Sequence, residues 1–477
     1  MKKIFIGLMT LVSLVSMTSC KDFLEQPIPD TTNEPLVFSK AEYIEANLMG
    51  CYHYFKSTST MSYTFMGGKT YAALDSRGDD VVNINNQQTL KDTYEMNVLG
   101  SNQLENYPTW VMAYSIINEC NVFIDNMASY NPVEKGIISA EVAAQYIAEA
   151  KFLRAYTYYV LCQLYSQPYC KNPESPAVPL RLTGLKASGN NDCPLSSIGK
   201  IYEQIIADCN PTALASQTLK TRATADAARM LKMRVEMAMG KWSDAIVTGS
   251  EITGYTLVAD MTTLYGFFEE KGYSNSEMIF ILPMTSMDSP NTQSSVADYY
   301  SLNAQVGWLD TEAGILSKEA YCLEADQRIS ALTEWGEKYL YTKKFTNIGT
   351  KTDWIPQMRY AETLLNLAEC YANVGDRESL DKAKAALKTV RERAIPAESD
   401  ILNIDELTGK DAILEAVYNE RRAELICEGI RGADIARRGE NFVKKNSFVD
   451  INIAPGDSRY VWPIPDSEYA YNNALEK

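Results

Sequence analysis

The chain has 477 residues, of which 46% are hydrophobic, so it carries enough apolar material for a large core. Its formal net charge of -16 argues against binding to nucleic-acid phosphates or to anionic lipid headgroups. The 30 tyrosines and 6 tryptophans exceed what a core needs, and we expect some of these rings to be exposed.

The N-terminus has the pattern of an export signal. Two lysines precede a short apolar run, and small residues follow up to Cys20. The Thr18-Ser19-Cys20 ending resembles a bacterial lipobox, in which the cysteine becomes the acylated first residue. We therefore expect a signal peptide over residues 1–19 and a lipidated tether over 20–39, attached through Cys20. The alternative is an ordinary signal peptide in which this cysteine is incidental.

Apolar residues at helical spacing predict a series of α-helices along the rest of the chain. We expect helices over residues 40–55, 110–127, 140–165, 198–209, 224–239, 242–252 and 410–429, and a helical hairpin over 358–393.

The hairpin over 358–393 indicates the architecture. Ala361, Leu365 and Ala368 make one apolar stripe, Gly375 ends the first helix, and Ser379 is expected to cap the second. Helices joined by so short a turn pack antiparallel, and the order of small and large residues resembles a tetratricopeptide-type hairpin. The predicted fold class is therefore mainly α, with tetratricopeptide-like helical hairpins forming a scaffold, long irregular insertions and little β structure.

Two long segments lack helical periodicity, at about residues 57–106 and 254–355. Both are polar and aromatic, and a short strand around Ile281 is the one regular element expected in the second. Function on a helical scaffold normally resides in such insertions, so we expect the binding residues there.

Besides Cys20, nine cysteines remain, an odd number that rules out a complete disulfide set. Four of them lie in helical patterns and are expected in the core, namely Cys120, Cys162, Cys370 and Cys427. The pairs Cys162–Cys170 and Cys193–Cys209 remain open.

Catalytic and metal motifs find little support. His53 is the only histidine, so a nucleophile–histidine system would depend on it alone. Asp75, Asp79 and Asp80 could hold a cation, but their spacing is not that of an EF-hand loop. Many carboxylates could serve a glycosidase, but nothing selects a pair. We expect no catalytic residue, metal or cofactor.

Short motifs in a fixed order carry a family resemblance. They are CKDFLE (20–25), IINECN (116–121), EAKFLRA (149–155), RYAETLLNLAE (359–369), NERRAEL (419–425) and WPIP (462–465). Together they span nearly the whole chain and resemble the SusD/RagB family, the surface lipoproteins of Bacteroidetes nutrient-uptake systems. The chain departs from the family pattern after Glu428-Gly429, where Ile430, Gly432 and Ala433 follow.

The resemblance implies a single SusD-like domain over residues 40–477 that binds a ligand and is not an enzyme. Such proteins sit on the outer membrane, facing outward, and deliver glycan to a SusC-like TonB-dependent transporter. Three alternatives remain: an oligopeptide-binding member of the family, a helical-repeat scaffold that binds only protein, and a hydrolase.

A sugar site needs flat aromatic rings for the C–H faces and polar side chains for the hydroxyl groups. The resemblance places such residues in both insertions. The candidates in the first are Tyr71, Asp75, Arg77 and Tyr94, and those in the second are Tyr299, Tyr300 and Trp308, of which Trp308 is the strongest. Glu362, Arg421 and Arg422 are instead expected to form ion pairs between helices.

Overall fold

The structure, a computed structural model, describes residues 34–58, 63–84, 90–187, 189, 191–215, 219–267, 275–290, 294–303 and 306–475. The expected signal peptide, Cys20 and most of the expected tether lie outside these residues. Among the helices so described, none combines the length and the apolar character that a membrane span requires.

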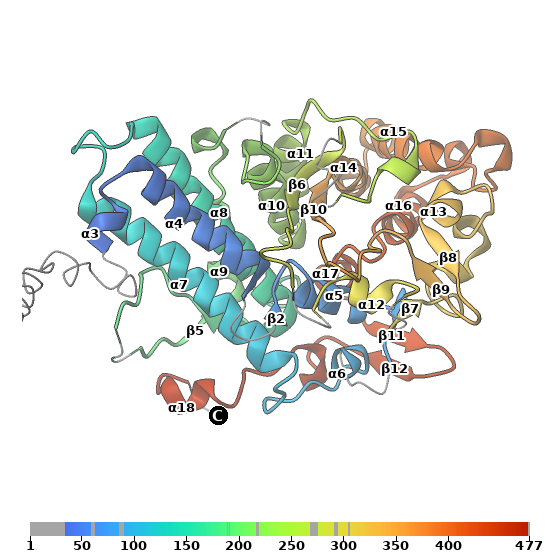
Figure 1. Ribbon diagram of the computed structural model, residues 1–477. Helices are drawn as coiled ribbons and strands as arrows, with labels where there is room; N and C mark the ends of the chain where they lie inside the picture. The colour runs from blue at the N-terminus through green and yellow to red at the C-terminus, as the bar shows by residue number, and fades with distance from the viewer. Residues whose placement is uncertain are drawn as a thin grey trace, which may run out of the picture.

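The first part of the chain forms a helical bundle, seen at the left of Figure 1, in which all helices but the short first one are long. Its helices are α3 (Glu34–Val37), α4 (Ala41–Lys56), α7 (Asn106–Tyr130), α8 (Ala140–Tyr165) and α9 (Ile198–Asp208). Leu48 of α4, Ile116 of α7 and Leu153 of α8 belong to the same apolar core. α8 begins where the hydroxyl of Ser139 accepts a hydrogen bond from the backbone N–H of Val142.

A second group of helices runs from the centre of Figure 1 toward its upper right. It consists of α10 (Ala225–Ala238), α11 (Trp242–Ser250), α14 (Tyr360–Val374), α15 (Arg377–Ala394) and α16 (Lys410–Glu424). Shorter helices complete the chain: α5 (Lys69–Ser76), α6 (Lys91–Tyr94), α12 (Ala297–Tyr300), α13 (Gln327–Ser330), α17 (Arg431–Arg437) and α18 (Glu468–Tyr471). The expected class, mainly α with helical hairpins, is confirmed.

The α14–α15 hairpin forms as the sequence predicts. Leu365 of α14 and Leu387 of α15 lie in one apolar cluster, which α16 extends with Val417. Gly375 ends α14 in the left-handed region, at a φ of +83° that favours glycine. The expected cap was wrong: the side chain of Asp376 is the cap, and it accepts a hydrogen bond from the backbone N–H of Ser379.

The insertions contain more regular structure than their composition indicates. The strands are β1 (Ser57–Thr58), β2 (Tyr63–Thr64), β3 (Val81–Val82), β4 (Pro176–Pro179), β5 (Leu195–Ser197), β6 (Met278–Leu282), β7 (Trp308–Leu309), β8 (Thr333–Trp335), β9 (Leu340–Thr342), β10 (Ile355–Arg359), β11 (Phe442–Lys445) and β12 (Asp450–Ile453). β6 confirms the strand expected around Ile281 and pairs antiparallel with β10. A four-stranded sheet has the order β3-β7-β9-β8, so the two insertions meet in one sheet.

Buried ion pairs fasten the second insertion to the helices. The guanidinium of Arg359 lies 2.7 Å from Glu277, 2.6 Å from Glu424 and 2.7 Å from Glu428. All four groups are almost fully buried, so each charge depends on its partners for stability. Two of the ion pairs expected between helices are confirmed: Glu362 of α14 pairs with Arg234 of α10, and Arg421 of α16 pairs with Asp434 of α17. Arg422 of α16 pairs instead with Asp79 and Asp80, which lie in the bend after α5.

The nine cysteines of the described region are all free. The four that were expected in the core are buried, as are Cys51 and Cys209. Neither of the two disulfides left open by the sequence is formed.

Candidate functional site

An open concavity of about 730 Å³ lies beside β8 and β9, at the right of Figure 1. We call it the β8–β9 concavity. Its volume falls within the range of about 300 to 1,000 Å³ that is usual for small-molecule sites. It is lined by Leu302, Asn303, Trp308, Trp335, Gly336, Glu337, Lys338, Tyr339 and Tyr341, all from the second insertion.

A β-hairpin positions the aromatic side chains of this concavity. Trp335 of β8 stands opposite Leu340 of β9, and the backbone N–H of Gly336 donates to the carbonyl of Tyr339 at 2.9 Å to close the turn. β7 pairs with the other side of β9, with Leu309 opposite Leu340. This pairing brings Trp308 next to the hairpin.

The rings form a stacked pair with one more exposed ring. Trp308 and Tyr339 stack with their centroids 3.9 Å apart and an interplanar angle of 10°, and Phe448 meets Trp308 edge-on at 5.4 Å. Trp308 is only 9% exposed, whereas Trp335 is 63% exposed. The concavity therefore has a rigid aromatic wall and one freely accessible indole.

Polar side chains accompany the rings. Asn303, Glu337 and Lys338 line the concavity, and the Lys338 ammonium lies 4.9 Å from the ring centroid of Tyr339. A hydrogen bond with Tyr339 raises the pKa of Lys338, so this side chain stays a charged donor. Flat apolar rings next to donors and acceptors suit a ligand whose surface alternates apolar faces with hydroxyl groups.

Sequence reasoning missed Trp335 and Tyr339. The signal was present, because residues 333–342 read TEWGEKYLYT, in which a Gly-Glu-Lys turn separates two short aromatic runs. That arrangement is typical of a β-hairpin. The hairpin explains why both rings face the same concavity.

Trp308, the strongest sequence candidate, does line the concavity, but Tyr339 and Phe448 cover most of its surface. Tyr299 and Tyr300 are completely buried, and the Tyr300 hydroxyl donates to the carbonyl of Ala72 at 2.9 Å. The expectation that these two tyrosines form an accessible platform is therefore revised. Tyr300 packs the second insertion against α5, where its hydroxyl also meets Ser76.

The candidates from the first insertion are also buried, with at most 2% of each side chain exposed. The Tyr71 hydroxyl donates to the carbonyl of Pro356, and Arg77 donates to the carbonyls of Gln163 and Tyr460. Tyr94 accepts a hydrogen bond from Asn446 and packs in the same apolar cluster as Trp308, so the structure brings these two candidates together behind the wall. Tyr71, Arg77 and Tyr94 were expected to contact the ligand. They have structural roles instead, because their polar groups are bonded inside the protein.

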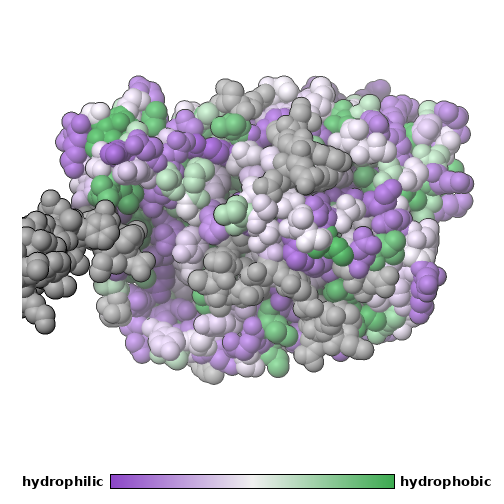
Figure 2. Space-filling model, viewed as in Figure 1, coloured by the Kyte–Doolittle hydropathy of each residue, from purple (hydrophilic) through white to green (hydrophobic). Residues whose placement is uncertain are grey.

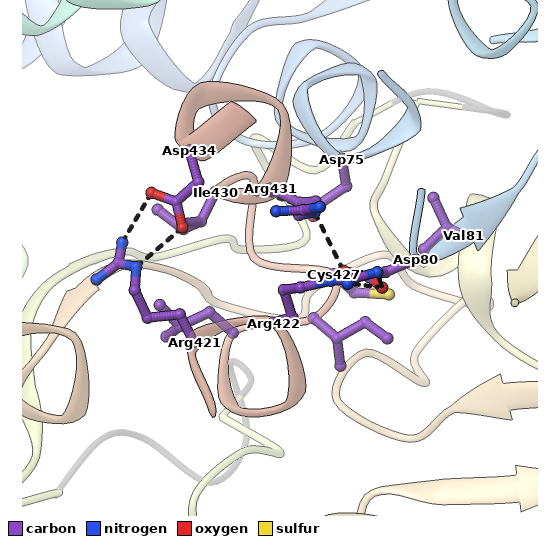
Figure 3. Close-up of a pocket in the computed structure, with 11 residues that line it drawn as sticks. Asp75, Asp80, Val81, Arg421, Arg422, Cys427, Ile430, Arg431 and Asp434 are labelled. Atoms are coloured by element: carbon purple, nitrogen blue, oxygen red, sulfur yellow. Dashed lines mark hydrogen bonds and ion pairs between the residues drawn. The ribbon is translucent and has the colours of Figure 1, made fainter. Parts of the chain in front are cut away.

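Asp75 likewise faces the interior, in the group of charged residues that Figure 3 shows. It accepts hydrogen bonds from the backbone N–H groups of Gly429 and Arg431. Burial raises the pKa of Asp75 to about 7, although these two hydrogen bonds oppose the shift. Its expected role at the ligand is therefore revised to one of anchoring α5 to the segment before α17.

The neighbouring Asp79 and Asp80 form ion pairs with arginines. Arg422 lies 3.0 Å from Asp79 and 2.7 Å from Asp80, and Arg431 lies 2.6 Å from Asp79. The cavity between them measures about 10 Å³, about the space of one water molecule. Within the described ranges, no group of three or more His, Cys, Asp or Glu residues is arranged to hold a metal ion.

Two family models match the chain. The model described as the SusD family matches residues 244–477, and the model described as "starch-binding associating with outer membrane" matches residues 22–236. No curated protein matches the chain.

Solved structures match this chain over more of its length than either family model does. A SusD superfamily protein from Bacteroides fragilis is 46% identical, with a TM-score of 0.86 over 92% of this chain and 100% of that one. A SusD superfamily protein from Bacteroides thetaiotaomicron shares the fold at 22% identity and a TM-score of 0.76, over 92% of this chain and 99% of that one. A SusD-like carbohydrate binding protein from Bacteroides vulgatus shares it at 20% identity and a TM-score of 0.74, over 91% and 97% of the two chains. The chain belongs to the SusD/RagB family.

Proposed function

We propose that this protein captures glycan chains in the β8–β9 concavity at the bacterial cell surface. It is held at the outer membrane by a lipid on Cys20 and passes the glycan to a SusC-like TonB-dependent transporter. It binds the glycan without cleaving it. Family membership supports the general role, because one of the two matched families is described as starch-binding.

The observation that carries the proposal is the exposed Trp335 beside the stacked Trp308–Tyr339 pair. A pyranose ring has an apolar C–H face that packs on an aromatic ring, and its hydroxyl groups reach polar side chains at the edge. Asn303, Glu337 and Lys338 supply those groups. The open concavity leaves room for a chain of sugar units to continue past the rings.

Charge narrows the choice of glycan. The net charge of -16 repels strongly anionic polysaccharides, which favours a neutral glycan. Weak binding at each site is sufficient for uptake, because clustered surface receptors raise the overall affinity through avidity.

Affinity electrophoresis against a panel of neutral polysaccharides tests the proposal. We expect at least one polysaccharide to retard the wild-type protein and the same polysaccharide to retard the Trp335→Ala variant much less. Tyr43→Ala is the matched control, because Tyr43 is an exposed ring on α4, outside the concavity. Equal retardation of the wild type and Trp335→Ala would contradict the proposed site, and release of reducing ends on long incubation would contradict a purely binding role.

An oligopeptide is the second candidate ligand. β8 is the outer strand of the four-stranded sheet, and in the described part of the chain no further strand pairs with it. It borders the same concavity, so an extended peptide would add a strand at its outer edge. In that case a mixed peptide library would compete with the polysaccharide for retention. Failure of such a library to bind would leave the glycan as the ligand.

A further inference from the structure

A second cavity, of about 200 Å³, lies beside α18. Figure 1 shows α18 at the lower left and the β8–β9 hairpin at the right edge, so the two cavities are well separated. Figure 2 gives the same view of the surface and shows polar residues over much of this face. We call the second cavity the α7–α18 pocket. It is lined by Tyr114, Ile117, Asn118, Asn121, Arg181, Thr183, Leu185, Asn191, Glu468 and Tyr471.

Side chains from α7 and α8 hold the segment that follows β4 in place. Asn118 makes two hydrogen bonds with the backbone of Leu185, at 3.1 and 2.7 Å. Asn121 donates to the carbonyl of Arg181 at 3.1 Å, and the Tyr158 hydroxyl accepts from the backbone N–H of Arg181 at 2.7 Å. The wall that carries Arg181 is therefore organised before any ligand arrives, which lowers the entropy cost of binding.

Two opposite charges line the pocket and keep unused hydrogen-bonding capacity. Arg181 donates from Nη2 to the carbonyl of Asn191 at 2.6 Å, and in the described part of the chain no carboxylate forms an ion pair with it. Its other N–H groups remain for a ligand. The carboxylate of Glu468 accepts from Trp110 Nε1 at 3.0 Å and from Asn472 at 3.2 Å, which fixes its orientation and leaves a lone pair on each oxygen.

Apolar surface completes the pocket. Tyr471 is 80% exposed, so its ring is accessible to a ligand. Tyr114, Ile117 and Leu185 contribute the remaining apolar wall. The cavity is smaller than the range of about 300 to 1,000 Å³ that holds larger ligands, so one ring fits better than a chain.

We propose that the α7–α18 pocket binds a single pyranose ring, at a site separate from the β8–β9 concavity. The ring packs on Tyr471, and two adjacent hydroxyl groups bond to Arg181 and Glu468. A hydroxyl suits both partners, because it can accept from the guanidinium and donate to the carboxylate. A uronic acid would fit the same geometry with its carboxylate on Arg181.

Nuclear magnetic resonance of the tryptophan indole groups tests this pocket by itself. The indole N–H of Trp110 donates to Glu468, so its resonance reports on the α7–α18 pocket, while the resonance of Trp335 reports on the concavity. The probes are the methyl glycosides of glucose, galactose, mannose and glucuronic acid. We expect at least one to shift the Trp110 resonance saturably, with binding at least fivefold weaker in both Arg181→Gln and Tyr471→Ala. Tyr43→Ala should titrate like the wild type.

The inference is overturned if no probe moves the Trp110 resonance, or if Arg181→Gln and Tyr471→Ala titrate like the wild type. It is also overturned if glycine or L-alanine moves that resonance and the sugars do not, because the pocket would then recognise an amino acid. Tighter binding of the glucuronide than of the neutral glycosides would show that the carboxylate of the sugar binds Arg181. The Trp335 resonance tests the proposed function in the same sample, so failure of one proposal is distinguishable from failure of the other.

Discussion

Trp335 and Trp308 line the same concavity, but their contributions differ because one ring is exposed and the other is covered. Replacing Trp335 by alanine removes a ring that is 63% exposed, so the free energy of unfolding should change by no more than about 0.5 kcal/mol. Trp308→Ala removes a ring that stacks on Tyr339 and meets Phe448 edge-on, and we expect a loss of about 3 kcal/mol. Urea unfolding of the two variants measures both values. Equal stabilities would show that Trp308 does not support the wall.

Asp75 should make stability depend on pH. An unfolded aspartate titrates near about pH 3.9, whereas burial raises the pKa of Asp75 in the folded chain to about 7. Between these values the folded protein holds a proton that the unfolded chain has lost, so the free energy of unfolding falls as pH rises from about 4 to 7. The slope contributed by this group is about 1.4 kcal/mol per pH unit.

Asp75→Asn cannot ionise, so its stability should fall less steeply over the same range of pH. Urea unfolding at intervals between pH 4 and 7 measures the two slopes. Burial also raises the pKa of Glu105 to about 7 and of Asp353 to about 6, but both groups are present in both proteins. Parallel slopes would contradict the assignment to Asp75.

At the scale of elements, the sequence predicts the helices far better than the insertions. The expected helix over 140–165 matches α8 (Ala140–Tyr165), because its apolar period is long and Ser139 caps it. The strands of the β3-β7-β9-β8 sheet are two or three residues long, too short for a period to be read. Their pairing depends on contacts between distant segments, which no local pattern encodes.

The sequence predicts which segment holds the candidate site, but not which residues form it, because those residues are also brought together by contacts between distant segments. The aromatic and polar composition of the second insertion correctly predicts that it lines the concavity. Composition does not distinguish Tyr300, which is buried, from Trp335, which is exposed. Exposure is set by the partners that each ring meets in the folded chain. Of the seven candidates, only Trp308 lines the concavity.

The ion pairs of Arg359 should hold the insertion to the scaffold. Arg359→Gln removes one cation from the buried carboxylates of Glu277, Glu424 and Glu428, which keep Arg393 or Lys344 as a partner. We therefore expect the free energy of unfolding to fall by about 3 kcal/mol, the lower end of the cost of breaking a buried ion pair. Arg459→Gln is the control, because Arg459 and its partner Asp457 have 53% and 33% of their side chains exposed, and its free energy of unfolding should stay close to that of the wild type. Similar losses of unfolding free energy in both variants would mean that the buried ion pairs of Arg359 contribute no more to stability than an exposed pair.

At the scale of the whole molecule, the proposed lipid on Cys20 decides where the protein acts. Cys20→Ala should abolish incorporation of radiolabelled palmitate and release the chain from the outer-membrane fraction. Cys322→Ala removes an exposed cysteine of the folded region and should keep the label. Binding of glycan by the two purified full-length variants should be the same. Label retained in Cys20→Ala would contradict the anchor.

The most direct measurement of glycan capture in the β8–β9 concavity is calorimetric titration of a neutral oligosaccharide that the wild type retains. One stacked ring contributes about 1 to 1.5 kcal/mol, so Trp335→Ala should raise the Kd about fivefold to tenfold or abolish detectable heat. Tyr43→Ala should bind like the wild type. We expect this loss of affinity at unchanged stability, and an unaltered Kd in Trp335→Ala would contradict glycan capture in the β8–β9 concavity.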